Sequence, residues 1–210
     1  MLLCIWAGWS GLKLFKFVNR FKQRLQESRL LVQCLEFCRQ TEVRLTEDMG
    51  RGVFAIEQLE PFQLLTIYDG ERISPFAYRQ KLKKFPEAKG YIWTISDRRI
   101  VDPTDDTGTV SSDSKNRAPL INEPPQGSAV NVIPIVTDNY IWMVSIESIE
   151  SGQQLYTTYG PRYERSYASE LSDHHGRVML TEQQQHELRL LAERCPLLKT
   201  GIEIFLSGAQ

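Results

Sequence analysis

The sequence predicts an α+β protein whose core is mostly β, with helical segments at both ends of the chain. Short segments rich in β-branched and aromatic residues fill the middle, and Gly, Pro, Asp or Asn separate them, which is typical of strands and turns. The two ends instead carry apolar residues at helical spacing. With 210 residues, 41% hydrophobic and 24% charged, the chain can form one sizeable domain with a modest extension.

The first part of the chain, residues 1–41, is predicted to be a basic amphipathic helical extension. Apolar positions recur at helical spacing and predict one or two helices over about 12–39. Residues 1–40 hold seven basic and two acidic residues, whereas the whole chain has a net charge of −1. Such a basic face is either simply solvated or contacts a partner surface. We expect a weak membrane-surface contact through residues 1–30 and no direct nucleic-acid site.

The first twelve residues are apolar, but they are too few to predict a spanning helix. They lack the positive segment and the cleavage site of a secretory signal. An anchor, a targeting segment and a wrongly chosen start all stay open for this stretch. We expect it to be dispensable for the function of the core.

Strands are predicted between residues 42 and 165, and a helical segment is predicted over 166–210. A short helix over 75–87 interrupts the strands, and residues 102–116 form a polar loop. Near the C-terminus, residues 181–195 have a Thr cap and an apolar helical face. The predicted strands are TEVRLTE, GVFAIE, FQLLTIYDG, YIWTIS, RRIVDP, AVNVIPIV, YIWMVSIE and QLYTTYG.

The cysteines and histidines do not predict a metal site. No CxxC pair occurs, and the pair His174-His175 lacks partners at ligand spacing. The cysteine spacing is not that of a secreted disulfide scaffold, which favours a reducing compartment. We expect an intracellular protein of the nucleus or cytoplasm, with an organelle or a membrane as alternatives. The four cysteines are Cys4, Cys34, Cys38 and Cys195.

Four segments of the predicted strand region form a recognisable series. They are GRGVFA at 50–55, YDGERI at 68–73, KNRAPLINE at 115–123, which Asn131 follows, and GQQLYTTYG at 152–160. In this order and spacing they resemble the SET domain of protein lysine methyltransferases. The resemblance covers roughly residues 42–165 and implies a β-clip core of short strands with a pseudoknot-like crossing.

The chain also departs from the family pattern. The family's His-Ser-Cys is Glu123-Pro124-Pro125 here, its Arg before Phe-Ile is Pro119, and the acidic pair before Leu155 is Gln153-Gln154. The zinc-binding cysteine cluster that often follows the domain is missing. An aromatic segment with Tyr163 and Tyr167 stands in its place, as in SET proteins that close the site with an aromatic helix.

The resemblance implies an S-adenosylmethionine-dependent methyltransferase that acts on a lysine side chain of a protein, histone or non-histone. Tyr159 matches the family's key tyrosine, which orients the reacting groups, and Tyr68 matches a second tyrosine of the lysine channel. Thr157 matches a channel position two residues before the key tyrosine. No metal is implied in the site. The cofactor-binding positions are Gly50, Arg51, Gly52, Asn122, Glu123 and Tyr159.

The residues themselves allow this chemistry. Gly50 and Gly52 let main-chain groups approach a ligand, although a tight turn before a strand would also suit them. Asn122 offers both amide donors and an acceptor. Threonine at 157 leaves room for two or three methyl groups on the amine, which we favour, whereas a water held by its hydroxyl would limit the product to one. Mass spectrometry of a methylated substrate distinguishes these outcomes.

Other side chains near the motifs are expected to have structural roles. We expect Tyr91, Trp93 and Trp142 in the core, and Lys115 and Arg117 in solvent. Two other kinds of function stay open. One is a catalytically inactive SET-like module that binds a protein or peptide, and the other is a membrane-surface protein that acts through its N-terminal helix. Binding of the methyl donor separates the enzyme from both.

Overall fold

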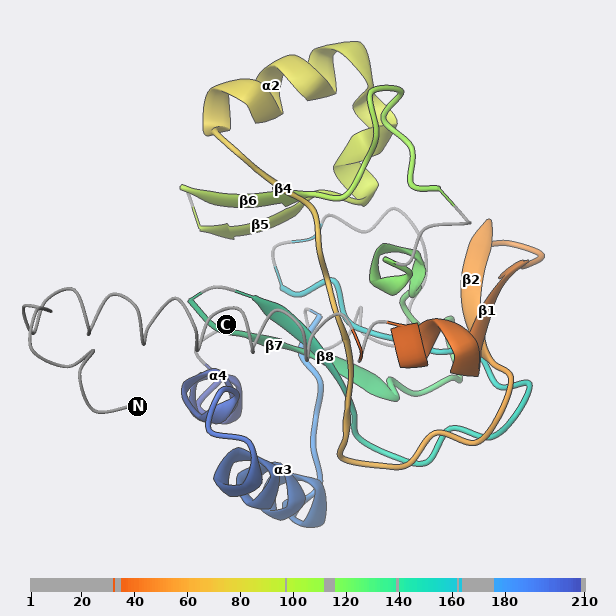
Figure 1. Cartoon of the computed structure of the whole chain (residues 1–210), viewed down its shortest axis with the longest axis vertical. Coiled ribbons are helices and arrows are strands. Elements are labelled where there is room, and N and C mark those ends of the chain that lie inside the picture. The colour runs from red at the N-terminus through yellow and green to blue at the C-terminus, as the bar shows by residue number, and fades with distance from the viewer. Residues whose placement is uncertain are drawn as a thin grey trace, which may run out of the picture.

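The computed structural model has the predicted α+β composition, with helices around small antiparallel sheets (Figure 1). The strands are β1 (Thr41–Leu45), β2 (Arg51–Ala55), β3 (Leu64–Ile67), β4 (Glu71–Ile73), β5 (Trp93–Ser96), β6 (Arg99–Asp102), β7 (Val132–Val136) and β8 (Ile141–Ser145). The helices are α2 (Pro75–Lys84), α3 (Glu182–Arg194) and α4 (Lys199–Leu206), with 3-10 turns η1 (Pro86–Gly90) and η2 (Ala118–Leu120). The structure describes residues 32, 35–96, 98–111, 116–138, 140–161, 163 and 176–208.

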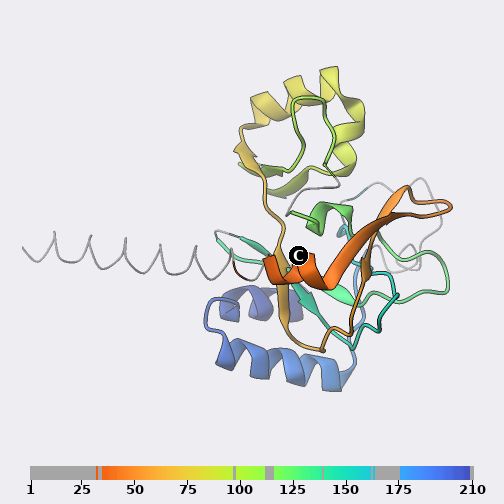
Figure 2. The same cartoon turned by 45° about the vertical axis from the view of Figure 1, so that its right-hand side comes forward.

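The described strands form three antiparallel sheets, in the orders β1–β2, β3–β8–β7 and β4–β6–β5. Figures 1 and 2 show that the third sheet, α2 and η1 form a lobe at one end of the molecule, apart from α3 and α4 at the other. The sheet β3–β8–β7 lies between them. We refer to residues 71–102, from β4 to the end of β6, as the upper lobe.

The central sheet is the most deeply buried part of the fold, because α3 and α4 pack against β7 and β8. A capping box starts α3: the Thr181 hydroxyl accepts from the Gln184 amide, and the Gln184 side chain accepts from the Thr181 amide. Helix α4 comes so close to β7 that a Cβ on Gly201 would lie 2.7 Å from the Val136 carbonyl oxygen. Glycine at this position therefore sets the distance between helix and sheet.

A close main-chain approach joins the start of β4 to the end of β6. A Cβ on Gly70 would lie 2.6 Å from the Asp102 carbonyl oxygen, so the sequence Tyr-Asp-Gly-Glu needs glycine here. The buried Asp102 carboxylate pairs with Lys81 Nζ of α2 at 3.1 Å and accepts from the Thr104 hydroxyl at 2.6 Å. This paired carboxylate ties α2 to β6, because a buried charge is stable only when it has such partners.

Several predictions about the elements are corrected or lie outside the described residues. QLYTTYG does not form a strand; it makes only isolated bridges, through Gln154 to β2 and through Tyr156 to Asn122. Helix α4 was not predicted in its own right. Residues 32 and 35–40 are helical, but the rest of the predicted helix over 12–39 lies outside the described residues, as does the membrane-contact segment 1–30.

The same limit applies to Lys115, Tyr167, His174, His175 and two of the cysteines. Across the part of the chain that the structure describes, no helix is both long and apolar enough to cross a membrane. The domain boundaries and the pseudoknot-like crossing stay predictions.

Replacing Gly70 with alanine should lower the free energy of unfolding by about 1–3 kcal/mol, because the new Cβ would collide with the main chain of Asp102. Gly90→Ala is the matched control, since a Cβ there meets nothing within 4 Å and Gly90 does not have a positive φ. Urea denaturation of both variants measures the difference. Equal stabilities of the two variants would contradict the close-approach argument.

Candidate active site

The three side chains predicted to line a channel lie around one narrow cavity. Tyr68, Thr157 and Tyr159 all border a cavity of about 40 Å³, although some ninety residues of sequence separate the first from the other two. Aromatic rings form much of the remaining wall. The other lining residues are Gly90, Tyr91, Ile92, Trp93, Ala118, Pro119, Ile121 and Tyr163.

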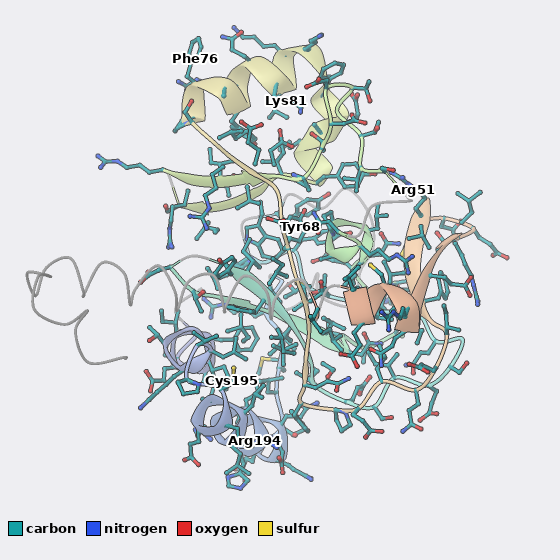
Figure 3. The ribbon with its side chains drawn as sticks, in the orientation of Figure 1. Arg51, Tyr68, Phe76, Lys81, Arg194 and Cys195 are labelled. Carbon is teal, nitrogen blue, oxygen red and sulfur yellow. The ribbon has the colours of Figure 1, made fainter. Side chains whose placement is uncertain are left out.

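Tyr68 follows β3 and lies in the centre of the molecule, between the upper lobe and the sheet β3–β8–β7 (Figure 3). Its hydroxyl donates to the Tyr91 carbonyl oxygen, and its ring meets that of Trp93 edge-on at 5.3 Å between centroids. Burial raises the pKa of Tyr68 well above its ordinary value of 10.0, with smaller contributions from Tyr159 and Asp102. The hydroxyl therefore stays protonated, and its oxygen can accept a hydrogen bond.

Tyr159 also lines the narrow cavity. Its ring packs edge-on against Tyr163, with 4.8 Å between the ring centroids. Burial raises the pKa of Tyr159 above its ordinary value of 10.0, and Tyr163 and the Glu123 carboxylate raise it further. Two neutral phenols consequently border the cavity at physiological pH.

Glu123 positions the main chain of Tyr159. Only 2% of Glu123 is exposed, and its Oε1 accepts from the Tyr159 amide at 2.7 Å. A carboxylate acceptor makes this a charge-assisted hydrogen bond, which is stronger than a neutral one. Sequence reasoning placed Glu123 among the cofactor-binding positions and missed this contact, which the departure from the family's histidine could have suggested.

Thr157 leaves an unpaired polar atom in the protein interior. The residue is 2% exposed, and within the described part of the chain its Oγ1 has no hydrogen-bond partner. Its amide is fixed, because it donates to the Asn122 carbonyl oxygen at 2.8 Å. Leaving a buried hydroxyl unpaired costs about 1–3 kcal/mol. A water or a small polar ligand group in the cavity would remove this cost.

The two predicted donor-binding segments lie side by side. Asn122 Nδ2 donates to the Arg51 carbonyl oxygen at 3.1 Å, although these residues are far apart in sequence. The Arg51 guanidinium donates to the Val110 carbonyl oxygen, and Figure 3 shows Arg51 at one end of β2. The bond from Asn122 holds the first and third motifs of the series against each other.

The two glycines of GRG differ in their surroundings. Gly50 has a φ of 68° in the β1–β2 turn, and a Cβ there would meet nothing within 4 Å. A Cβ on Gly52 would instead lie 2.5 Å from Gln154 Nε2. Gly52 thus makes room for a side chain of the protein, whereas Gly50 serves the positive φ of the turn and borders open space.

A larger cavity opens beside the narrow one. Its volume is about 550 Å³, and it shares Trp93 and Tyr159 with the narrow cavity. β5, the β7–β8 turn and the start of α4 contribute other parts of its wall, including the half-exposed Leu197. Among the described residues, neither cavity is lined by Gly50, Gly52 or Asn122. The narrow cavity adjoins the larger one through Trp93 and Tyr159, and it adjoins the segment that leads to Asn122 through Ala118, Pro119 and Ile121.

Three expectations about neighbouring residues need correction. Tyr91 and Trp93 are only partly buried and line the narrow cavity, whereas Trp142 is buried in the core as expected. Arg117 is not simply solvated: it donates to the carbonyl oxygens of Cys38 and Thr41. Sequence reasoning missed these cavity residues because Tyr91, which ends η1, and Trp93, which begins β5, look the same in sequence whether they cover a core or a channel.

Comparisons with known proteins give likenesses in structure but none in sequence. No family model and no curated protein matches the sequence. Among solved structures, the methyltransferase domain of human PR domain-containing protein 2 is similar, with 14% sequence identity and a TM-score of 0.41. The alignment covers 56% of this chain and 75% of that chain.

Alkaline pH should destabilise the protein partly through Tyr68. The unfolded chain loses this proton near pH 10.0, but the folded protein retains it, so the free energy of unfolding falls as pH rises beyond that value. The expected slope is about 1.4 kcal/mol per pH unit for one such tyrosine. Tyr68→Phe should make the fall shallower in urea denaturation between about pH 10 and pH 11. A slope equal to that of the wild type would contradict the assignment.

Proposed function

We propose that this protein is a SET-like methyltransferase that uses S-adenosylmethionine to methylate a lysine side chain of a protein. The observation that carries the proposal is the convergence of Tyr68, Thr157 and Tyr159 on one narrow cavity. From the motifs alone, Tyr68 and Thr157 were assigned to the lysine channel and Tyr159 to the orientation of the reacting groups. A chance arrangement would not be expected to bring all three to the same small space.

Two features of the predicted donor-binding residues support this cofactor, one at Gly50 and one at the narrow cavity, which Tyr159 lines. Gly50 borders open space, and Asn122 holds the Arg51 carbonyl oxygen beside it. S-adenosylmethionine supplies an electrophilic methyl group on a positively charged sulfur. We expect the main chain of Gly50–Gly52, together with Asn122 and Glu123, to hold the donor, and Tyr159 to border its methyl group.

The narrow cavity suits a lysine amine that must lose its proton before it can react. Removing a proton from free lysine at neutral pH costs about 4–5 kcal/mol. Aromatic walls lower this cost, because burial disfavours the ammonium form. The Tyr68 oxygen can accept from the neutral amine, since the hydroxyl proton is donated to the Tyr91 carbonyl oxygen. This contact would orient the amine for displacement at the methyl carbon.

The cavity of about 550 Å³ is the proposed groove for the segment of the substrate that carries the lysine. It adjoins the narrow cavity at Trp93 and Tyr159, so a chain lying in it could insert one side chain toward Tyr68. β5 is an edge strand of its described sheet and forms part of the groove wall. An extended peptide can therefore lie along this edge.

A non-catalytic peptide-binding module is the second candidate. The specific observation in its favour is Gln154, which occupies the space beside Gly52 where a donor could otherwise approach the main chain. In that case the groove would bind a peptide without methyl transfer. Donor binding separates the two functions.

Calorimetric titration with S-adenosylmethionine tests the proposal directly. The wild type should bind it, and Asn122→Ala should weaken binding about tenfold or more, because the Arg51 carbonyl oxygen loses its partner. Gln58→Ala is the matched control, since this exposed amide contacts only Ser148 among the described side chains. No binding by the wild type at millimolar donor would remove the enzyme function.

Tyr159→Phe should lower the rate of methyl transfer by about a hundredfold or more, the scale of a lost hydrogen bond in the transition state. The substitution keeps the ring against Tyr163, so thermal stability should change little. Tyr78→Phe on α2 removes a hydroxyl outside the described cavities and is the control. An unchanged rate on an accepted peptide would refute the assigned role of Tyr159.

A further inference from the structure

The upper lobe is basic, although the whole chain is slightly acidic. Residues 71–102 contain eight basic and four acidic residues, a net charge of +4, whereas the full chain has −1. Helix α2 contributes several of these charges, and none of its residues is buried. Figures 1 and 2 show α2 on the outer side of the lobe. The excess positive charge thus belongs to the lobe that also contributes Tyr91 and Trp93 to the narrow cavity.

Part of this charge surrounds a third cavity, which we call the arginine cavity. It has a volume of about 420 Å³ and lies between the upper lobe and the β7–β8 turn. Three exposed arginines, Arg72, Arg98 and Arg99, line it, together with the carboxylates of Asp69 and Asp138. The described lining therefore has a net charge of +1, and the arginines come from β4, the β5–β6 turn and the start of β6.

The arginine cavity is continuous with the proposed substrate groove. The two share the residues Ile95, Arg99, Asp138 and Tyr140. The arginine cavity also reaches Tyr68, which lines the narrow cavity. A segment that lies in the groove with a lysine at the narrow cavity would consequently pass next to the arginines.

Arg99 has a structural role in this arrangement. Its guanidinium donates to the carbonyl oxygens of Thr137 and Asp138, and it lies 4.0 Å from the fully exposed Asp138 carboxylate. It thereby joins β6 to the β7–β8 turn. Arg98 instead makes no hydrogen bond or ion pair with any residue that the structure describes. Arg98 is therefore the side chain best suited to test recognition without disturbing the fold.

We propose that the arginine cavity recognises acidic side chains of the substrate, so that the target lysine lies in an Asp- or Glu-containing segment. This inference rests on the proposed function of the neighbouring groove. Guanidinium groups pair with carboxylates through two parallel hydrogen bonds, which makes arginine well suited to this recognition. The occupant is an extended protein segment, because the cavity continues the groove in which a peptide would lie.

A nucleic-acid partner fits these observations less well. Duplex binding requires many phosphate contacts over a broad basic surface. The arginine cavity instead contains two carboxylates as well as three guanidiniums, and its volume suits a few side chains. A local charge of +1 matches one or two carboxylates better than a row of phosphates.

The geometry of β5 predicts where the acidic residues should be. Trp93 borders the narrow cavity and Arg98 borders the arginine cavity, five positions later in the sequence. The strand itself covers the three steps from Trp93 to Ser96, about 10 Å at roughly 3.3 Å per residue, and Arg98 lies in the turn that follows. An acidic residue about three to five positions from the lysine, on one side only, would reach the arginines.

Peptides with one central lysine test this proposal. A Glu pair is placed three to five positions before or after the lysine, and a Gln pair at the same positions is the reference. For the wild-type full chain with donor, the Glu pair on one side should raise kcat/KM about tenfold over the Gln pair. The ratio of kcat/KM for the Glu peptide to that for the Gln peptide should fall toward one in Arg98→Gln and below one in Arg98→Glu. Arg79→Gln, which removes a charge from α2 outside the cavity, should keep the ratio.

Fluorescence anisotropy of the same labelled peptides separates this inference from the proposed function. If no peptide is methylated, the proposed function fails. The role of the arginine cavity is still supported if the wild type binds the Glu peptide in preference to the Gln peptide and Arg98→Gln abolishes this preference. Equal binding of Glu and Gln peptides by the wild type would overturn the inference. The inference would also be overturned if Arg79→Gln lost the preference for the Glu peptide as fully as Arg98→Gln. Binding of a DNA duplex that depends on Arg98, without any preference between the peptides, would overturn it as well.

Discussion

The hydrogen bonds of residues 153–159 hold the candidate site together. This segment passes β2, where the Leu155 amide donates to the Val53 carbonyl oxygen. It then meets Asn131, whose buried side chain donates to the Gln154 carbonyl oxygen and accepts from the Tyr156 amide. Each of these partners comes from a different part of the chain. Without these bonds, nothing would bring the last motif to the first and third.

The same segment explains how Thr157 and Tyr159 are oriented. The Thr157 amide donates to the Asn122 carbonyl oxygen, and the Tyr159 amide donates to Glu123. Consecutive residues 122 and 123 therefore fix alternate residues of the last motif. Because these bonds use the main chain of 157 and 159, both side chains remain available to the cavity. Burial then keeps the Tyr159 phenol neutral by raising its pKa.

Charge is distributed differently around the narrow cavity and on the upper lobe. Near the narrow cavity, the carboxylate of Glu123 is buried and accepts from the Tyr159 amide. On the upper lobe, the arginines are exposed and line an open cavity. Buried, paired charges serve to hold a structure in one geometry, whereas exposed guanidiniums can exchange water for a ligand at little cost. This contrast favours chemistry in the narrow cavity and recognition outside it.

The sequence by itself determined that short strands make up most of the core and that helices lie around them, and it located most of these elements. Periodicity and turn residues identified the strands from β1 to β8 other than the short β4, as well as α2 and α3, because these signals are local. The sequence did not identify QLYTTYG as an irregular segment. The alternating residues of this segment are typical of a strand, but it forms isolated bridges to different partners instead of a continuous ladder.

Only the tertiary structure decided which residues meet. The motifs indicated Tyr68, Thr157 and Tyr159 separately, but their common cavity depends on contacts between residues about ninety positions apart. The Glu123 contact to Tyr159, the two structural reasons for Gly52 and Gly70, and the cavity position of Trp93 are all long-range properties. Local sequence patterns cannot predict them, because a side chain's neighbours across the core are set by how the sheets and loops pack, not by its own residue type.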